Sequence, residues 1–284
     1  MGRVTTGVWS THTVELLPDR VVKRYRQWAE QEHEREWRAL TLLQAYAPGL
    51  SPVPLELDTT SPTLVMSRVP GTVLRGSVVE PAQISALAAA YTALHHGVPP
   101  EVAAALPLRT WHQRQCVEYI GRRYPELAAS ALDPEITRAA AEGMAWLNAT
   151  ASCWAAEPDL PPVLGQADGN LANFLWDGAR IAIVDFEESG RSDIPFELAE
   201  VAEHVSWVDT GFPAEDFLSR FPLTDDELGR LTECRRLLAL LWLTTLCLAG
   251  PHDGRNPPDT PLRQARRLRA LLGCRELARG CVPE

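Results

Sequence analysis

The sequence lacks the features that mark several classes of protein. None of its 6 cysteines belongs to a Cys-x-x-Cys pair, so the spacing indicates neither a zinc site nor a disulfide framework, and we expect free thiols in a reducing compartment. No apolar signal segment stands at the N-terminus, and the longest apolar run, 237–249, is too short to cross a bilayer. We therefore predict a cytoplasmic protein with no membrane partner, and we interpret 237–249 as a buried helix.

Positive charge is also in short supply. The chain has 27 Lys and Arg against 37 Asp and Glu, and the formal net charge of −10 argues against the backbone of a nucleic acid as partner. The arginines that gather in 262–279 are expected to form the solvated face of a helix. With 284 residues, of which 45% are hydrophobic, the chain is long enough for one large domain or two lobes.

The most informative stretch is a predicted β-hairpin. Two short apolar runs, Phe174–Trp176 and Ile181–Val184, stand on either side of Asp177-Gly178. A tight turn needs residues that tolerate positive φ, and Asp-Gly is a strong signal for one. The pattern therefore predicts two antiparallel strands joined near residue 178.

Three oxygen-bearing side chains should meet at the open end of this hairpin. Asn173 begins the first strand, Asp185 ends the second, and Asp168 lies on the loop that enters the same end. Turn formation is the simpler interpretation of any one of them. Together, however, they form a set that suits a hard cation such as Mg²⁺.

The pattern Asp168-x4-Asn173, followed by a hairpin and Val184-Asp185-Phe186-Glu187, resembles the core of a known family. That family comprises the aminoglycoside phosphotransferases and the related choline-kinase-like small-molecule kinases, which share the two-lobed fold of protein kinases. The resemblance implies that Asp168 is the catalytic base for the substrate hydroxyl. It also implies that Asn173 and Asp185 bind the Mg²⁺ that bridges the phosphates of ATP.

One position departs from the pattern of the family. Two residues before the base the family usually has His, which ties the loop to neighbouring backbone, and here Gln166 occupies that place. Glutamine also donates and accepts hydrogen bonds, so we expect Gln166 to be structural and compatible with catalysis. The departure keeps open an alternative, a pseudokinase that binds nucleotide as a regulatory module.

The N-terminal part carries further resemblance. Strands are predicted over 5–9, 13–17 and 21–26, with a polar turn at Ser10-Thr11-His12. In the family this first turn covers the ATP phosphates. Here it has no Gly-x-Gly-x-x-Gly sequence, so Ser10 and Thr11, with Thr13, are only suggested as phosphate neighbours, and a solvent-exposed turn is the alternative.

Val21-Val22-Lys23 resembles the strand that carries the ATP-binding lysine. The following helix, predicted over 28–46, contains an Arg35-Glu36 segment similar to one in the family, which implies that Glu36 is the partner of Lys23. Without the resemblance, a strand lysine would be interpreted as an exposed edge residue. The other acids of this helix are expected to face solvent.

Two more strands, 52–57 and 63–69, lead into Pro70-Gly71, which fits the hinge between two lobes. The resemblance places the backbone of Ser67 to Val69 against the adenine edge, with Met66 behind the ring. Core packing is the other interpretation of Met66, and both can hold together.

The rest of the chain is predicted to be mainly helical. The expected helices are 81–96, 109–124, 134–155, 196–208, 213–221, 225–249 and 262–279. Strands followed by helices indicate the α+β class, and the resemblance implies a bilobal protein-kinase-like fold. A small antiparallel sheet of five strands with one helix, 1–69, forms the nucleotide-binding lobe, and 70–284 forms the catalytic and acceptor-binding lobe.

Acidic residues dominate the stretch after the hairpin. From 185 to 216 there are ten acids against one base, Arg191. Asp193 and Glu197 resemble residues that brace the catalytic loop in the family. The resemblance places this segment around the acceptor cleft, although some of the remaining acids are expected simply to face water. Glu188, Glu200 and Glu203, with Trp207, are expected to bind a cationic acceptor.

The predicted function is ATP- and Mg²⁺-dependent phosphoryl transfer to a hydroxyl of a small molecule. The acceptor expected from the charge is an aminoglycoside or another aminated natural product, as in antibiotic resistance by phosphorylation. A peptide Ser/Thr kinase of natural-product maturation is a further alternative. These patterns do not specify which acceptor is used, whether the donor is ATP or GTP, or the oligomeric state.

Overall fold

The structure is a computed structural model, which describes residues 3–5, 12–26, 31–207, 212–248 and 256–273. The chain forms two compact units, Met1–Thr110 with Pro161–Ser192, and Trp111–Leu160 with Asp193–Glu284. These units reflect packing, whereas the predicted division at residues 69 and 70 marks a hinge. The lobes 1–69 and 70–284 therefore stay a prediction.

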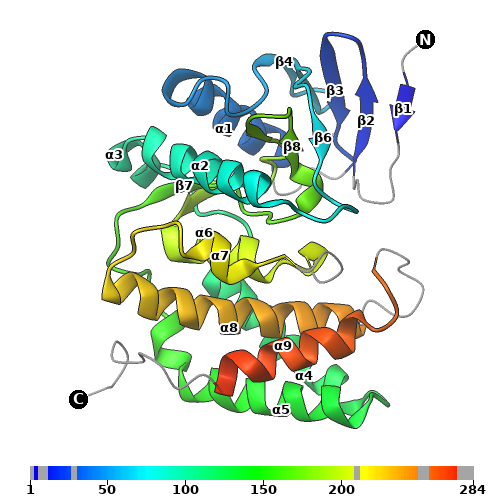
Figure 1. Ribbon diagram of the computed structural model, residues 1–284, viewed down its shortest axis with the longest axis vertical. Coiled ribbons are helices and arrows are strands. Elements are labelled where there is room, and N and C mark those ends of the chain that lie inside the picture. Colours follow the sequence, from blue (N-terminus) through cyan, green and yellow to red (C-terminus); the bar gives the residue numbers. More distant parts are fainter. Residues whose placement is uncertain (1–2, 6–11, 27–30, 208–211, 249–255, 274–284) are drawn as a thin grey trace. The chain divides into compact units, whose positions relative to one another are not determined.

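The first unit contains the predicted five-stranded antiparallel sheet, in the order β1-β2-β3-β5-β4 (Figure 1). Its strands are β1 (Arg3–Thr5), β2 (Thr13–Leu16), β3 (Arg20–Arg24), β4 (Pro54–Asp58) and β5 (Thr63–Ser67). The first strand was expected at 5–9, of which residues 6–9 lie outside the described residues. The register places Lys23 of β3 between Val14 of β2 and Leu64 of β5, at the centre of the sheet.

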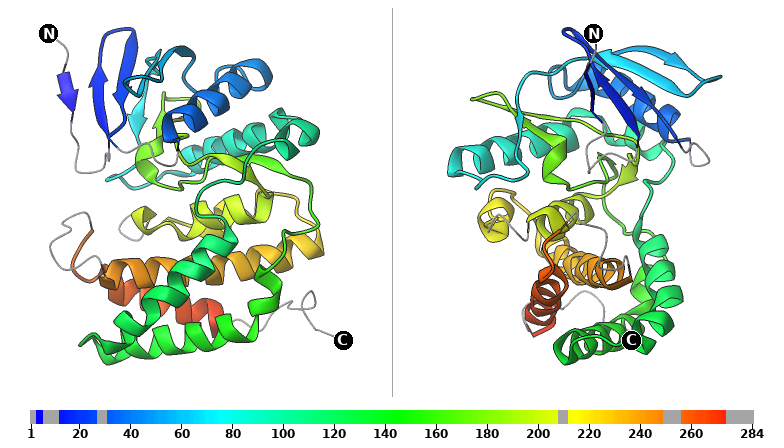
Figure 2. Two further views of the ribbon diagram at one scale, coloured as in Figure 1. Left: turned by 180° about the vertical axis from the view of Figure 1, so that it is seen from behind. Right: turned by 90° about the vertical axis from the view of Figure 1, so that its right-hand side faces the viewer.

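Helix α1 (Glu32–Tyr46) packs against β4 and β5, as the views in Figure 2 show. Its buried residues follow helical spacing from His33 and Glu36 to Leu40 and Leu43, so one face of the helix meets the sheet. This face carries a carboxylate, that of Glu36, among apolar side chains. The helix thereby brings an acid into the interior next to β3.

The predicted hairpin is confirmed. Strands β8 (Phe174–Trp176) and β9 (Ile181–Ile183) pair antiparallel, and Gly178 in the turn has φ 102°. The backbone N–H of Val184 donates to the carbonyl of Asn173 at 3.0 Å, so these two residues face each other at the open end as expected. A third strand, β6 (Thr72–Val73), adds to the edge of β8.

Four further elements of the first unit accompany the hairpin. They are α2 (Pro81–Gly97), α3 (Pro100–Ala104), β7 (Val163–Gly165) and β10 (Gly190–Ser192). Helix α2 was predicted at 81–96 and packs against β7 and β9. The pairing of β7 with β10 was not predicted, because three-residue strands carry no measurable period.

In the described residues of the second unit, the regular secondary structure is helical. Its helices are α4 (Gln113–Ala129), α5 (Pro134–Ala149), α6 (Ile194–Glu203), α7 (Ala214–Leu218), α8 (Asp225–Leu248) and α9 (Thr260–Gly273). Helix α8 packs against α4, α5, α6 and α9, and Leu237 to Leu241 are buried, which confirms the expected buried helix. Among the described residues no helix is both long and apolar enough to span a membrane.

The cysteines depart from expectation at one position. Cys116, Cys234 and Cys247 retain their thiols, whereas Cys153 is disulfide-bonded. The expectation of thiols throughout is therefore wrong for Cys153. Sequence spacing could not show this, because a disulfide depends on which residues the fold brings together.

Two glycines give a matched test of how closely β10 packs against the backbone near Arg109. A Cβ on Gly190 of β10 would lie 2.6 Å from the backbone N of Arg109, whereas nothing lies within 4 Å of the Cβ position on Gly121 of α4. We expect Gly190→Ala to lower the free energy of unfolding by about 1–3 kcal/mol or more, because backbone must move. Gly121→Ala should raise it by about 0.5–1 kcal/mol, as in other helices.

Denaturant unfolding of the two variants measures both effects. The packing described for β10 would be contradicted if Gly190→Ala were as stable as the unchanged protein.

Candidate active site

The first unit encloses a cavity of about 410 Å³ between the sheet and the hairpin. It brings together most of the residues that the sequence singled out for nucleotide and metal, namely Lys23, Glu36, Met66, Ser67, Val69, Asn173 and Asp185. They come from β3, α1, β5 and its continuation, and both ends of the hairpin. Residues far apart in the chain thus line one cavity.

Lys23 is the centre of the polar wall. Its side chain is 7% exposed, and Nζ lies 2.7 Å from Oε2 of Glu36 and 2.6 Å from Oε2 of Glu187. Nζ also donates to Oδ1 of Asp185. One ammonium group therefore faces three carboxylates, which come from α1 and from the segment after β9.

The pKa values of this cluster follow from its charges. Burial opposes the positive charge of Lys23, but the carboxylates of Asp185, Glu36 and Glu187 outweigh it and raise the pKa of Lys23 well above its ordinary value. Burial opposes ionisation of Glu187 too, but Lys23 and His12 lower its pKa.

The pKa of Asp185 shifts in the direction opposite to that of Glu187. Burial is the largest cause, and together with repulsion from Glu187 and Glu36 it outweighs the attraction of Lys23 and raises the pKa of Asp185. The wall thus places three carboxylates around the single positive charge of Lys23.

Glu36 is held by more than the lysine. The hydroxyl of Tyr25 donates to Oε2 at 2.5 Å, and the backbone N–H of Phe186 donates to Oε1 at 3.3 Å. Burial and the negative charge of Glu36 raise the pKa of Tyr25, so Tyr25 stays a hydroxyl donor. Both oxygens of this buried carboxylate are therefore fixed, and Glu36 in turn fixes Lys23.

Asp185 has an unusual backbone conformation, with φ 66° in the left-handed region. The side chain of Gln166 supports it: Nε2 donates to the carbonyls of Val184, at 3.3 Å, and Asp185, at 3.2 Å. The hydroxyl of Tyr91 donates to Oε1 of Gln166 at 3.1 Å and fixes the amide. The structural role expected for Gln166 therefore agrees with its contacts.

Asp168 lies at the mouth of the hairpin, with a half-buried side chain. Its Oδ2 accepts a hydrogen bond from Nδ2 of Asn173 at 2.8 Å, and its Oδ1 accepts one from the backbone N–H of Asn170 at 3.0 Å. Two donors thus orient the carboxylate. Because the amide nitrogen of Asn173 points to Asp168, its carbonyl oxygen is the atom available to a cation in the cavity.

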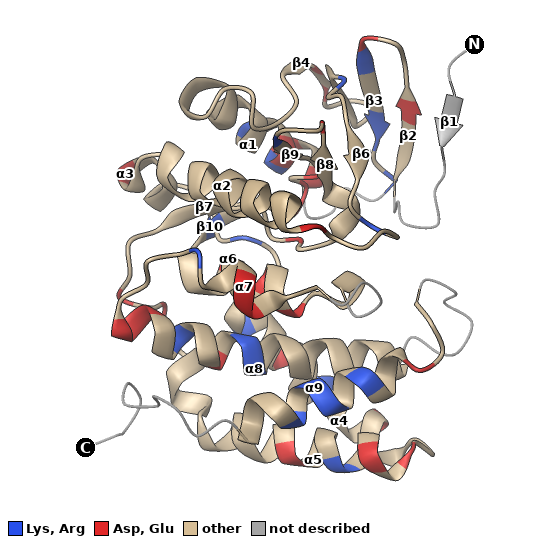
Figure 3. Ribbon diagram, in the orientation of Figure 1, with Lys and Arg blue, Asp and Glu red and all other residues tan. Residues whose placement is uncertain are grey.

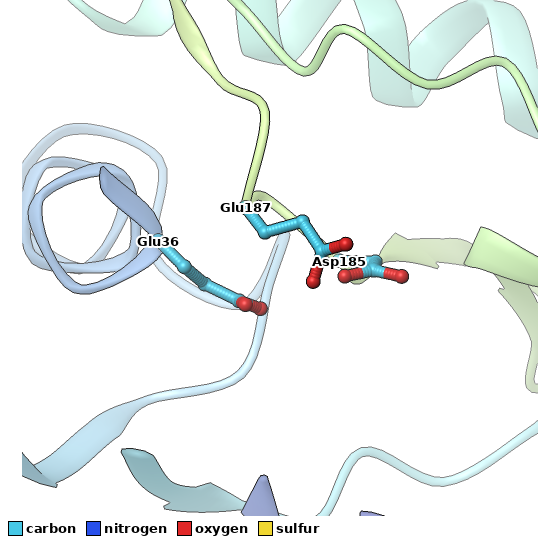
Figure 4. Close-up of side chains that lie close together, drawn as sticks. All are labelled: Glu36, Asp185 and Glu187. Atoms are coloured by element: carbon cyan, nitrogen blue, oxygen red, sulfur yellow. The ribbon is translucent and has the colours of Figure 1, made fainter. Parts of the chain in front are cut away.

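The carboxylates of the wall fit a metal ion. One oxygen each from Glu36, Asp185 and Glu187 lie within 4.8 Å of one another, and Figure 4 shows the three side chains converging. Such hard oxygen donors suit Mg²⁺. The predicted pair was Asn173 and Asp185, and sequence reasoning missed Glu187.

The residues predicted to contact adenine lie in another, more apolar part of the cavity lining. Met66 is buried on β5. The N–H groups of Ser67 and Arg68 donate to the carbonyls of Val53, at 2.8 Å, and Asp19, at 3.0 Å. Among the described residues the N–H of Val69 has no such partner, so it is the donor best suited to the adenine edge. Ser10 and Thr11 lie outside the described residues, and their phosphate contacts stay predictions.

The residues expected around the acceptor belong mainly to the second unit, where arginines alter their chemistry. Nε of Arg235 lies 2.7 Å from Oε1 of Glu203, and Nε of Arg267 lies 2.8 Å from Oε2. The side chain of Glu203 is 1% exposed. Both oxygens of this carboxylate therefore serve to join α6, α8 and α9. A contact of Glu203 with the acceptor stays a prediction.

Arginine partners also explain other acids of the stretch 185–216. Asp193 caps α6 and pairs with Arg230 at 2.6 Å, and Glu215 pairs with Arg235 at 2.7 Å. Figure 3 shows basic residues of α8 and α9 near acidic residues of neighbouring helices in this unit. The net negative charge around these acids is therefore smaller than the count along the sequence suggests. Their arginine partners lie later in the chain, outside the stretch that was counted.

The remaining three residues expected at the acceptor differ in position. Glu188 is half-buried in the first unit, and Glu200 is buried in α6. Trp207 is also buried and stacks on Phe212, with ring centroids 3.3 Å apart. Contacts of these residues with an acceptor stay predictions.

The ion pairs of Glu203 make a testable prediction. Glu203→Gln keeps the shape but leaves Arg235 and Arg267 without their buried counter-charge, so we expect the free energy of unfolding to fall by about 3 kcal/mol. Glu118→Gln, at an exposed position of α4, is the matched control and should change little. A loss no larger than that of the control in denaturant unfolding would contradict the packing role of Glu203.

Comparisons with known proteins show the family and the fold of the chain. The model of the phosphotransferase enzyme family matches residues 3–233. No curated protein sequence gives a match. A choline/ethanolamine kinase family protein from Mesorhizobium loti has a similar structure, with 19% identity, a TM-score of 0.71, and coverage of 99% of this chain and 90% of that one.

Two further solved structures are similar. For choline kinase LicA from Streptococcus pneumoniae the identity is 15% and the TM-score 0.60, with 96% of this chain and 92% of that one covered. For aminoglycoside phosphotransferase APH(4)-Ia the values are 19% and 0.64, with 96% and 92% covered. The chain therefore belongs to the phosphotransferase enzyme family, and it is a small-molecule phosphotransferase with a protein-kinase-like fold.

Proposed function

We propose that this protein transfers the γ-phosphoryl group of ATP, with Mg²⁺, to a hydroxyl group of a small molecule. The observation that carries the proposal is the buried ion pair between Lys23 and Glu36, 2.7 Å long, in the same cavity wall as Asp185. A lysine held by a helix carboxylate beside a metal-binding aspartate is the arrangement that protein kinases use for phosphoryl transfer.

Bound Mg²⁺ would supply positive charge that neutralises the negative charge developing during phosphoryl transfer. The residues that would hold it are Asp185 and Asn173, with Glu187 as the neighbouring carboxylate. Lys23 would bind phosphate oxygens, since Glu36 keeps its side chain in place. Structures of related phosphotransferases support a nucleotide here, since a mutant of APH(4)-Ia was solved with AMP-PNP and hygromycin B.

The proposed base is Asp168. Its carboxylate is oriented by Asn173 and by the backbone of Asn170, so one face can accept the proton of an acceptor hydroxyl. Most of the rate would come from holding the hydroxyl and the phosphate in line, and proton transfer would add to this. The contacts of Gln166 favour catalysis over the pseudokinase alternative, because they hold the backbone of Asp185.

The proposed acceptor is a hydroxylated amine. The similar structures are named for choline, ethanolamine and aminoglycosides, which all combine a hydroxyl with an amine or ammonium group. A net charge of −10 favours such cations over anionic acceptors. ADP release measured against choline, ethanolamine, several aminoglycosides and neutral polyols tests this class. Turnover confined to neutral or anionic acceptors would contradict it.

The role of Asp168 can be tested with the best acceptor of that panel. Asp168→Asn should lower kcat by about 100-fold or more and leave the dissociation constant of ATP nearly unchanged, because the amide cannot take the proton. Asp159→Asn, an exposed position, is the matched control. Turnover within a few fold of the unchanged enzyme would remove Asp168 from the role of base.

The metal site is tested by nucleotide binding without turnover. Asp185→Ala should abolish the strengthening of ATP binding by Mg²⁺, because a principal oxygen ligand is lost. Asn173→Ala should reduce this strengthening less. Calorimetric titration with and without Mg²⁺ measures it, and full Mg²⁺ dependence in Asp185→Ala would place the metal elsewhere.

A further inference from the structure

One histidine in the cavity wall has no part in the function proposed so far. His12 lies directly before β2, is 4% exposed, and lines the cavity together with Lys23 and Glu187. The sequence alone suggested only that it belongs to a polar turn. A buried polar ring in the wall of a cavity of this size is a candidate ligand contact.

The backbone determines which ring nitrogen of His12 carries a hydrogen. The N–H of Arg26 donates to Nδ1 at 3.1 Å, and a nitrogen that accepts cannot also donate. In the neutral ring the hydrogen is therefore on Nε2, which lies 3.0 Å from Oε2 of Glu187. The ring also packs against Tyr25, with centroids 4.7 Å apart. His12 is thus a fixed donor with a defined direction.

The acceptor of this hydrogen bond is shared. Oε2 of Glu187 lies 2.6 Å from Nζ of Lys23 and 3.0 Å from Nε2 of His12. Phosphate oxygens are strong acceptors of the same kind as carboxylate oxygens, so a phosphate at this wall can take over both donors. Glu187 is then left for the hard cation that its oxygen, with those of Glu36 and Asp185, is placed to bind.

The sequence of the first turn explains why a side-chain donor is useful here. Loops that cradle phosphates with backbone N–H groups rely on several glycines, which allow the backbone to approach closely. Between Thr5 and Thr13 the chain has one glycine, Gly7. A sequence with one glycine favours side-chain donors over such a backbone cradle, and His12 supplies a side-chain donor from a fixed position.

We propose that Nε2 of His12 donates a hydrogen bond to the terminal phosphate of the bound nucleoside triphosphate, exchanging Glu187 for a phosphate oxygen. This inference rests on the proposed function and adds a residue that binds the nucleotide. It predicts that His12 favours the triphosphate over the nucleoside alone, because only the triphosphate offers an acceptor at this wall.

The test compares ligands with and without phosphates. In the full chain with Mg²⁺, His12→Phe should raise the dissociation constant of ATP about tenfold or more and change that of adenosine less than about twofold. His12→Gln, which keeps a donor at the same reach, should stay within about threefold for both ligands. His96→Phe, at an exposed position of α2, is the matched control and should match the unchanged protein.

The outcomes separate this inference from the proposed function. If the unchanged protein binds ATP and His12→Phe binds it equally well, the role of His12 is overturned and the proposed function stands. Equal losses for ATP and adenosine would assign His12 to packing alone and also overturn the inference. An unchanged protein that binds no ATP would overturn the proposed function and this inference with it.

Discussion

The buried charge of Lys23 is the interaction on which the rest of the site depends. An ammonium group that is 7% exposed needs compensating charge, and the fold supplies three carboxylates from α1 and from the segment after β9. Glu36 is fixed by Tyr25 and by the backbone of Phe186, whereas Glu187 is shared with His12. Glu36 is therefore a fixed partner of Lys23, whereas Glu187 is a partner that a ligand can replace. This arrangement suits a ligand that brings phosphates and a cation together.

Secondary structure explains why these groups meet. Lys23 is placed by the central strand of a five-stranded sheet, Glu36 by the buried face of α1, and Asp185 by the end of a hairpin. Gln166 holds the left-handed backbone at Asp185 through two carbonyls, a conformation that costs about 1–3 kcal/mol when unsupported. The rigid elements therefore position the charges, and few of the contacts depend on long flexible loops.

Sequence patterns predicted much of this arrangement. The hairpin, the single strands and the long helices follow from turn chemistry and periodicity. The five-stranded sheet and the pair of Lys23 and Glu36 followed from a resemblance to a family. Glu187 was missed because nothing in its local pattern distinguishes it from a solvated acid. The ion pairs of Glu203 were not predicted, because its partners Arg235 and Arg267 lie later in the chain and charge counted along a sequence ignores such neighbours.

The central claim is that the carboxylates around Lys23 give way to phosphates and a metal. A crystal structure of the protein with Mg²⁺ and a non-hydrolysable ATP analogue tests it most directly. We predict that Nζ of Lys23 keeps Glu36, leaves Asp185 and lies within about 3.2 Å of a phosphate oxygen, with Asp185 bound to the metal. A nucleotide outside the cavity, or a Lys23 that still contacts all three carboxylates beside a bound nucleotide, would contradict the account.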